Sequence, residues 1–481
     1  MTVAMRKIAY FLFLGIILLQ GCSDFLENKP KGITIPSVFQ DYQKLMSSVS
    51  LTRVGSIYPM FLTDDVHLLF NVKTADSYNF ANKSEVQRNT YSFKAGQLFT
   101  PGQSDGLWNS LYDQIFTYNT VINEVMSVPD ASEKEKLRLR SEALVARAFQ
   151  YYILVNAYAN QYDATTASKD YGVPLILVAN INQKVHRSTV AQVYKQIEDD
   201  LKEALPNLKD RAAFVTYPSK AAVYSFFARL YLTMGKYEMA LENAKLALGV
   251  KSSLYDHKPY VVNDVTTWGR IVGVNGGTFL YDIDNPECIY LRNVSEQISN
   301  TCCVSVDLKN VFKKDLPDGA VDMRRALFYA DDKVNYGGTP LAFPGETTFG
   351  PWINHNYGFT TSENMLIAAE CEARIGSKDK AIEYLNTLRD SRIKSNQPLS
   401  ALDKEDALLK VLDERRREFA FVGYHRLFDL KRLNREERFK KSVIHNVEGV
   451  EFTLKPNDNR YILPVSQEVL DFNPDMPQYE R

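Results

Sequence analysis

The stretch AAVYSFFARLYLTMGKYEMALENAKLAL, residues 221–248, decides the fold. Its apolar residues recur every three or four positions in two runs, which is the spacing of two amphipathic helices. Gly235 lies between the runs and can close the turn. The small residues Ala228, Ala240 and Ala247 let the two helices approach closely, while the aromatic side chains fill gaps between neighbouring pairs. The stretch is therefore typical of a tetratricopeptide repeat, a helical hairpin of about 34 residues.

Further helices are predicted on both sides of this hairpin. A weaker copy of it occupies residues 362–389. Earlier in the chain, apolar periodicity predicts helices over residues 108–126, 133–158 and about 189–205, the last with Ser188 or Thr189 as its N-cap. One hairpin cannot bury its own apolar face, so other pairs must stack on it, and the earlier helices are the expected partners. The sequence predicts a mainly α fold.

Residues between the two hairpins have a different character. Residues 251–361 hold many Gly, Pro, Asn and Asp, and short strands such as 287–292 are expected there. A structureless loop of this length is unusual in a compact domain. We therefore expect an irregular, loop-rich ligand-binding layer over the helical scaffold. The predicted organisation, with residues 22–481 as one compact unit, is a signal peptide at 1–21, an N-terminal helical portion at 22–250, the layer at 251–361 and a C-terminal portion at 362–481.

The N-terminus predicts a lipoprotein. Arg6 and Lys7 precede an apolar run that is too short for the roughly 20 residues of a membrane span, and the run ends in the sequence Leu-Leu-Gln-Gly-Cys with Cys22 last. A peptidase can cleave after the small Gly21, and the Cys22 thiol can then carry a diacylglycerol. Stable anchoring takes about two acyl chains, which a doubly or triply acylated Cys22 provides. A secretory signal that is cleaved elsewhere is the alternative.

Composition excludes several classes of function. The chain is 45% hydrophobic and 24% charged with a net charge of −1, and it lacks the basic excess of a nucleic-acid-binding protein. None of its six histidines forms an H-E-x-x-H zinc motif. We predict no cofactor and no metal. The later cysteines are interpreted as isolated thiols, although a bridge from Cys288 to Cys302 or Cys303 stays open.

Aromatic residues beside polar ones suggest where a ligand binds. A flat ring can stack on the C–H face of a sugar, while amide, carboxylate and guanidinium groups bond its hydroxyls. The layer offers two such groups, and a third precedes the first long helix. Ordinary packing is the alternative for each ring, and packing is the expectation for Trp108 at a helix start. The candidate ligand-binding residues are Trp268 with Arg270, Trp352 with Asn354, and Tyr78 with Asn79.

Catalytic and calcium-binding interpretations are weaker. Ser104 sits in a G-x-S-x-G sequence, but no buried strand precedes it as a nucleophile elbow requires. A glycosidase needs two carboxylates that face each other across the sugar, and the sequence does not show this geometry for the pairs at 64–65 and 331–332. Asp315, Asp318 and Asp322 lack the spacing of a calcium loop. The run Arg415–Arg417 is flanked by Glu414 and Glu418, which favours ion-paired helix packing. We predict no catalytic residue and no enzyme.

Several segments stand out in chain order: 22–26 with Pro30, 142–149, 151–152, 172–175, the most specific piece 414–421 with Gly423, Arg426, 428–430 and Arg432, and finally 463–465, Glu468 and 473–474. In this order they resemble the SusD/RagB-like outer-membrane lipoproteins. The resemblance covers most of the chain and implies a scaffold at the cell surface that acts as a lid on a SusC-like, TonB-dependent transporter. The implied ligand is usually an oligosaccharide and sometimes a peptide. A tetratricopeptide scaffold that binds only a protein remains the alternative from another class.

Overall fold

The computed structural model describes residues 36–180, 185–262, 271–294, 296, 298, 301–336, 339–350 and 356–481. Helices dominate this part of the chain, so the predicted mainly α fold is confirmed. The α-helices are α2 (Phe39–Met46), α3 (Glu85–Tyr91), α4 (Gly106–Glu124), α5 (Glu133–Tyr158), α6 (Val190–Ala204), α7 (Lys220–Thr233), α8 (Tyr237–Val250), α9 (Val306–Val311), α10 (Met323–Phe328), α11 (Thr361–Ile375), α12 (Lys378–Arg392), α13 (Lys404–Phe419), α14 (His425–Leu433) and α15 (Gln467–Phe472).

Local capping signals set where the long helices begin. Before α5, the Ser132 hydroxyl accepts from the Glu135 N–H, and the Glu135 carboxylate accepts from the Ser132 N–H at 3.0 Å. Thr189 and Gln192 form the same reciprocal box at α6. Each cap satisfies N–H groups that lack helical partners and stabilises by about 1 kcal/mol. The predicted start of α5 and the Thr189 cap of α6 are therefore confirmed.

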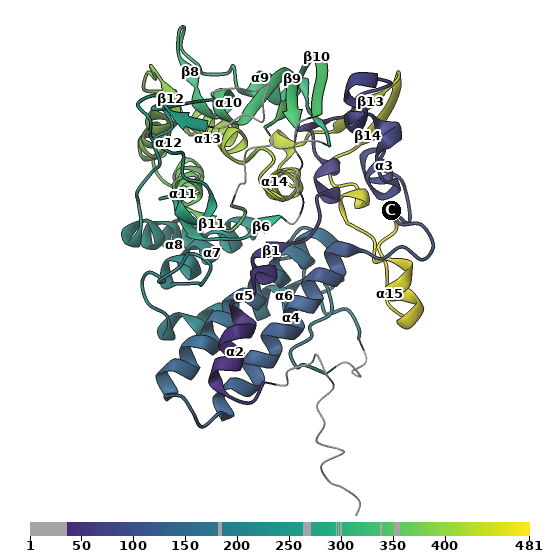
Figure 1. Ribbon diagram of the computed structural model, residues 1–481, viewed down its shortest axis with the longest axis vertical. Coiled ribbons are helices and arrows are strands. Elements are labelled where there is room, and N and C mark those ends of the chain that lie inside the picture. The colour runs from purple at the N-terminus through teal and green to yellow at the C-terminus, as the bar shows by residue number, and fades with distance from the viewer. Residues whose placement is uncertain are drawn as a thin grey trace, which may run out of the picture.

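The two hairpins pack directly on each other. Helix α7 packs on α8, α8 on α11, and α11 on both α12 and α13, although more than 100 residues of sequence separate the pairs (Figure 1). Ala240, Ala244 and Ala247 of α8 are fully buried, so the small side chains allow this close approach. The earlier helices α4, α5 and α6 also join the array, since the Phe149 ring of α5 lies 5.8 Å from Phe226 of α7.

Short strands lie mostly in or beside residues 251–361, as expected for the layer. β5 coincides with the strand predicted at 287–292 and pairs with β11, and the longest strands, β9 and β10, form a hairpin within the four-stranded sheet β2-β7-β10-β9 (Figure 1). The strands are β1 (Arg53–Val54), β2 (Val66–His67), β3 (Tyr260–Val262), β4 (Ile271–Gly273), β5 (Cys288–Tyr290), β6 (Asn293–Val294), β7 (Cys303–Val304), β8 (Val321–Asp322), β9 (Tyr329–Tyr336), β10 (Thr339–Phe349), β11 (Phe359–Thr360), β12 (Ile393–Lys394), β13 (Val443–Val447) and β14 (Val450–Leu454).

Ion pairs join α13 and α14 to Asp64 and Asp65 near the N-terminus and to Asp307 of α9. Arg416 bonds Asp65 at 2.7 Å and Asp307 at 2.6 Å, and Arg426 bonds Asp64 at 2.7 Å. Burial raises the pKa of Asp64, but the charges of Arg426 and Arg416 outweigh it and hold that pKa well below its usual value. The predicted ion-paired packing of the arginine run is confirmed. The Asp64 and Asp65 carboxylates are held by these structural pairs.

The cysteines and Trp108 also belong to the packed interior. Cys288, Cys302, Cys303 and Cys371 are free and buried, so the bridge left open from the sequence is not formed. Burial raises the pKa of the Cys302 thiol to about 12, which keeps it protonated and unreactive. Trp108 is buried at the start of α4, where its ring lies 4.9 Å from Tyr158, so its predicted packing role is confirmed.

Candidate functional site

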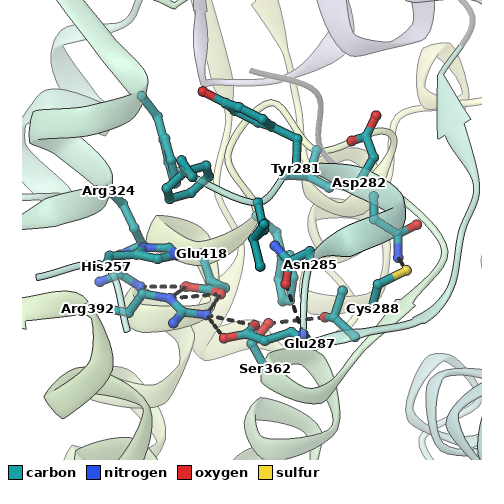
Figure 2. A pocket seen from close by; sticks show the side chains of 17 residues that line it. His257, Tyr281, Asp282, Asn285, Glu287, Cys288, Arg324, Ser362, Arg392 and Glu418 are labelled. Atoms are coloured by element: carbon teal, nitrogen blue, oxygen red, sulfur yellow. Dashed lines mark hydrogen bonds and ion pairs between the residues drawn. The ribbon is translucent and has the colours of Figure 1, made fainter. Parts of the chain in front are cut away.

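A pocket opens where the 251–361 layer meets helices α11, α12 and α13 (Figure 2). Water-sized molecules can occupy about 80 Å³ of it. This room suits the end of a ligand rather than a whole oligomer, because one water takes about 30 Å³ of liquid. The lining combines aromatic rings with charged and amide side chains, as expected for a site that recognises a polar ligand with apolar faces. Its principal residues are His257, Phe279, Tyr281, Asp282, Asn285, Glu287, Arg324, Phe328, Asn356, Arg392 and Glu418.

Phe279 is the centre of the aromatic wall. Its ring lies 5.7 Å from His257, 6.1 Å from Phe328 and 5.0 Å from Tyr281. Tyr260 of β3 packs edge-on against the same ring at 5.1 Å. Such tilted and edge-to-face contacts favour a rigid cluster, because the positive ring edges meet negative ring faces. The wall therefore holds the less buried Tyr281 ring at the rim.

Two buried arginines form the floor. Arg392 bonds both carboxylate oxygens of Glu287, at 2.7 and 2.8 Å, and Glu418 at 2.8 Å. Arg324 bonds Glu418 at 2.9 Å. Its guanidinium also bonds Glu414 at 2.5 Å, which extends the network beneath the pocket. Paired in this way, the buried charges are compensated.

Burial and ion pairing act in opposite directions on the pKa of each floor carboxylate. Burial alone would raise the pKa of Glu418, but the Arg392 and Arg324 charges outweigh it and lower that pKa. Burial is likewise the largest effect at Glu287 and raises its pKa, with Arg392 opposing it. In Figure 2, Tyr281 and Asp282 lie across the pocket from these ion pairs. A ligand would therefore meet the rim residues Tyr281, Asp282 and Asn285 first.

Four of the predicted ligand-binding residues lie outside the described residues: Trp268, Arg270, Trp352 and Asn354. The lipidation site Cys22 lies outside them as well. The described residues that border the two segments holding these tryptophans can be placed.

Both bordering sets lie at the pocket. Before the segment 351–355, the Gly350 N–H donates to the carbonyl of the lining residue Phe328 at 2.7 Å. After it, Asn356 lines the pocket and donates to the Tyr290 carbonyl at 2.9 Å. The segment 263–270 joins β3 to β4, and Tyr260 of β3 contacts the aromatic wall. Described residues that border both tryptophan-bearing segments thus lie in or next to the residues of one pocket.

The prediction for Tyr78 and Asn79 is corrected. Tyr78 is 0% exposed, and its ring packs 5.4 Å from Phe343. The Asn79 side chain is buried and closes a turn, accepting from the Val72 N–H and donating to the Val72 carbonyl at 3.0 Å each. A ring that stacks on a sugar must expose one face, so this pair serves packing. The polar residues that surround Tyr78 in the sequence wrongly indicated an exposed, ligand-binding ring.

The remaining catalytic and calcium interpretations gain no support. Ser104 lies in the exposed turn before α4 and does not follow a buried strand. Asp322 caps α10 and bonds Arg324 at 2.6 Å. In the described residues, no group of three or more His, Cys, Asp or Glu side chains could hold a metal ion. Over the same residues, no helix has the length and apolar character that crossing a membrane requires.

Sequence reasoning missed most of the pocket itself. His257, Phe328, Arg392 and Glu418 come from separate helices and loops, and no local pattern brings them together. The apolar sequence Phe279–Tyr281 after a glycine-rich turn was the one available signal.

The fold and pocket define a helical-repeat protein built to bind a ligand at the edge of a loop-rich layer. Comparison with known proteins then gives the family. Residues 24–232 match the family model described as starch-binding associating with outer membrane, and residues 356–481 match the model of the SusD family. Together these matches cover more than half of the sequence. The chain belongs to the SusD family, a family of binding proteins rather than enzymes and associated with the outer membrane.

Individual relatives agree with this assignment. SusD-like protein P2 of Formosa agariphila is 23% identical, covering 89% of this chain and 91% of the relative. The crystal structure of a SusD superfamily protein from Bacteroides thetaiotaomicron aligns with a TM-score of 0.68 at 21% identity, covering 92% of this chain and 100% of that one. A structure named as a laminarin-binding SusD-like protein aligns with a TM-score of 0.59 at 18% identity, covering 93% and 99%. These structural likenesses establish the shared fold.

Proposed function

We propose that this chain is a surface-exposed lipoprotein that binds an oligosaccharide and delivers it to a SusC-like, TonB-dependent outer-membrane transporter. Family membership supports nutrient capture, and the lipoprotein signal ending in Cys22 supports a lipid anchor. One structural neighbour is named for binding laminarin, a glucan, which supports an oligosaccharide as the ligand class.

The observation that carries the proposal is the convergence at one pocket. The aromatic wall around Phe279 and the rim residues Tyr281 and Asp282 lie together with described residues that border both tryptophan-bearing segments. We propose that Trp268 and Trp352 stack on sugar rings beside this rim, with Arg270 and Asn354 bonding the hydroxyls. Stacking on a few rings gives modest affinity, and a ligand awaiting import must be released. We expect a Kd of about 1 µM to 1 mM.

The test is retention of soluble polysaccharides in affinity gels, followed by calorimetry with oligosaccharides of the retained type. Laminarin, starch and a mixture of peptides are the first probes. The variants Trp268→Ala, Trp352→Ala and Tyr281→Ala should each weaken binding about tenfold or more without lowering Tm. The matched control is Phe472→Ala, because this ring is 83% exposed on α15 and lies outside the pocket.

Binding of peptides and no glycan would replace the ligand class with a peptide. Unchanged glycan binding in all three variants would refute the proposed site. Delivery is tested separately by co-purification of the protein with a TonB-dependent transporter from outer membranes, and absence of any such partner would refute that part.

A further inference from the structure

A second pocket lies away from the first and shares no lining residue with it. Water-sized molecules can occupy about 280 Å³ of it, close to the roughly 300 Å³ at which small-molecule sites begin. It is formed where the chain after α5 meets α14 and the segment 457–462. Its lining is almost entirely polar: Asn160, Gln161, Thr166, Asp170, Lys431, Arg435, Asn457, Asp458, Asn459, Tyr461 and Ile462.

Lys431 brings a buried cation to this pocket. Lys431 is only 5% exposed, and its Nζ donates to the carbonyl oxygens of Asn156 and Ala159 at the end of α5. In the described part of the chain, no carboxylate bonds this ammonium group. Burial lowers the pKa of Lys431 to about 7, and no charged neighbour contributes to that shift. The pocket therefore holds a cation that an anion could stabilise.

The other charged groups of the pocket already have partners. Arg435 pairs with Asp163, and Asp458 pairs with Arg460. Asp170 accepts from the Asn160 amide at 3.1 Å and from the Thr166 hydroxyl. Among the cations of this lining, Arg435 is paired with a carboxylate, whereas Lys431 is bonded only to neutral carbonyl groups.

Gln161 supplies an acceptor without a donor. The residue is 8% exposed, and its Nε2 donates to the Thr233 carbonyl at 2.7 Å, which fixes the orientation of the amide. Its Oε1 is buried and has no hydrogen-bond partner among the described residues. A buried acceptor left unpaired costs about 1–3 kcal/mol, so a ligand hydroxyl at this position would stabilise the protein.

The remaining amides also present acceptors. The Asn457 and Asn459 side chains donate their N–H groups to the carbonyls of Asn434 and Glu480, at 2.9 and 2.8 Å. Their side-chain oxygens therefore remain to accept, as do the carboxylates of Asp170 and Asp458. A lining rich in acceptors matches a ligand with many O–H donors, while the single uncompensated ammonium matches one negative group.

We propose that this second pocket binds one carboxylate-bearing sugar unit, a hexuronic acid, with its carboxylate on Lys431 and a hydroxyl on Gln161 Oε1. The site would let the protein bind an acidic glycan at a point separate from the aromatic pocket. It is independent of the aromatic rim, so the proposed function can fail without affecting it.

The test is calorimetry of the purified protein with glucuronate, glucose and acetate as probes. Glucuronate should bind at least tenfold more tightly than either of the others, because glucose lacks the anion and acetate lacks the hydroxyls. Lys431→Gln keeps an N–H donor for the α5 carbonyls but removes the charge, and it should reduce glucuronate affinity to the glucose level. Lys44→Gln is the matched control, because this side chain is 69% exposed on α2 and lines neither pocket, and this variant should bind glucuronate as the wild type does.

Each other outcome overturns the inference. Equal affinity for glucose and glucuronate, or unchanged binding by Lys431→Gln, would remove the role of Lys431. Acetate binding as tight as that of glucuronate would make the pocket a general anion site. No glucuronate binding would reject the site. The wild-type comparison among the three probes requires no variant, so it decides the matter even if Lys431→Gln does not fold.

Discussion

Replacing Arg392 with methionine should lower the free energy of unfolding more than replacing any residue at the rim of the aromatic pocket. Arg392 is 1% exposed, and it bonds both carboxylate oxygens of Glu287, both carboxylate oxygens of Glu418 and, at 2.8 Å, the Tyr255 carbonyl. Glu418 would keep Arg324, but Glu287 would lose its cation while staying buried. Removing one partner of a buried pair costs about 3–5 kcal/mol. We expect a loss of that size in the free energy of unfolding at pH 7, measured by urea denaturation.

The pH dependence provides a second readout. Without Arg392, burial should raise the pKa of Glu287 further in the folded state. A carboxyl whose folded pKa lies above its unfolded value contributes stability below the unfolded value and loses it as pH rises. The deficit of Arg392→Met relative to wild type should therefore shrink between pH 7 and pH 5.

The matched control is Arg392→Met combined with Glu287→Gln. Removing both charges leaves no unpaired carboxylate, so the double variant should recover about 1–3 kcal/mol relative to Arg392→Met. A deficit below about 1 kcal/mol in Arg392→Met, or a double variant less stable than the single one at pH 7, would refute the argument that pairing compensates these buried charges.

Three further tests address other parts of the chain. Gly423 has φ +53°, and a Cβ there would lie 2.3 Å from the Tyr357 ring, so Gly423→Ala should lower the free energy of unfolding by about 2–4 kcal/mol in urea denaturation. Gly102 also has a positive φ but faces open space, so Gly102→Ala should lower it by about 1 kcal/mol. Equal losses in the two variants would contradict the packing argument. Burial raises the pKa of Glu414, but the charges of Arg324, Arg417 and Arg389 outweigh it and lower that pKa from 4.5 to about 2. The free energy of unfolding should therefore fall as pH drops from about 4.5 to about 2. Glu414→Gln should flatten that fall, and an unchanged slope would contradict it. Cys22→Ser should abolish incorporation of labelled palmitate in cells, and continued labelling would contradict lipidation at Cys22.

Local signals in the sequence predicted the helices well. The period of apolar residues predicted the helix over residues 133–158, which α5 matches, because this pattern acts within a few residues along the chain. The glutamates that flank Arg415–Arg417 also predicted ion-paired packing. They could not identify Asp64 and Asp65 as its partners, since those lie about 350 residues earlier in the sequence.

The pocket depended on contacts that no local pattern encodes. Tyr78 stands among polar residues, yet tertiary folding turns its ring against Phe343, far along the chain in β10. Arg392 ends α12, where the sequence alone would suggest an exposed cation at a helix C-terminus. In the structure it is buried because the 251–361 layer covers that end of the helix and brings Glu287 to it.

A crystal structure of the protein soaked with an oligosaccharide that it retains in affinity gels tests the capture role most directly. The account predicts intact sugar rings beside Tyr281 and Asp282, with the aromatic wall around Phe279 unmoved. Sugar bound elsewhere on the molecule with this rim empty, or a cleaved product in place of the intact ligand, would contradict it.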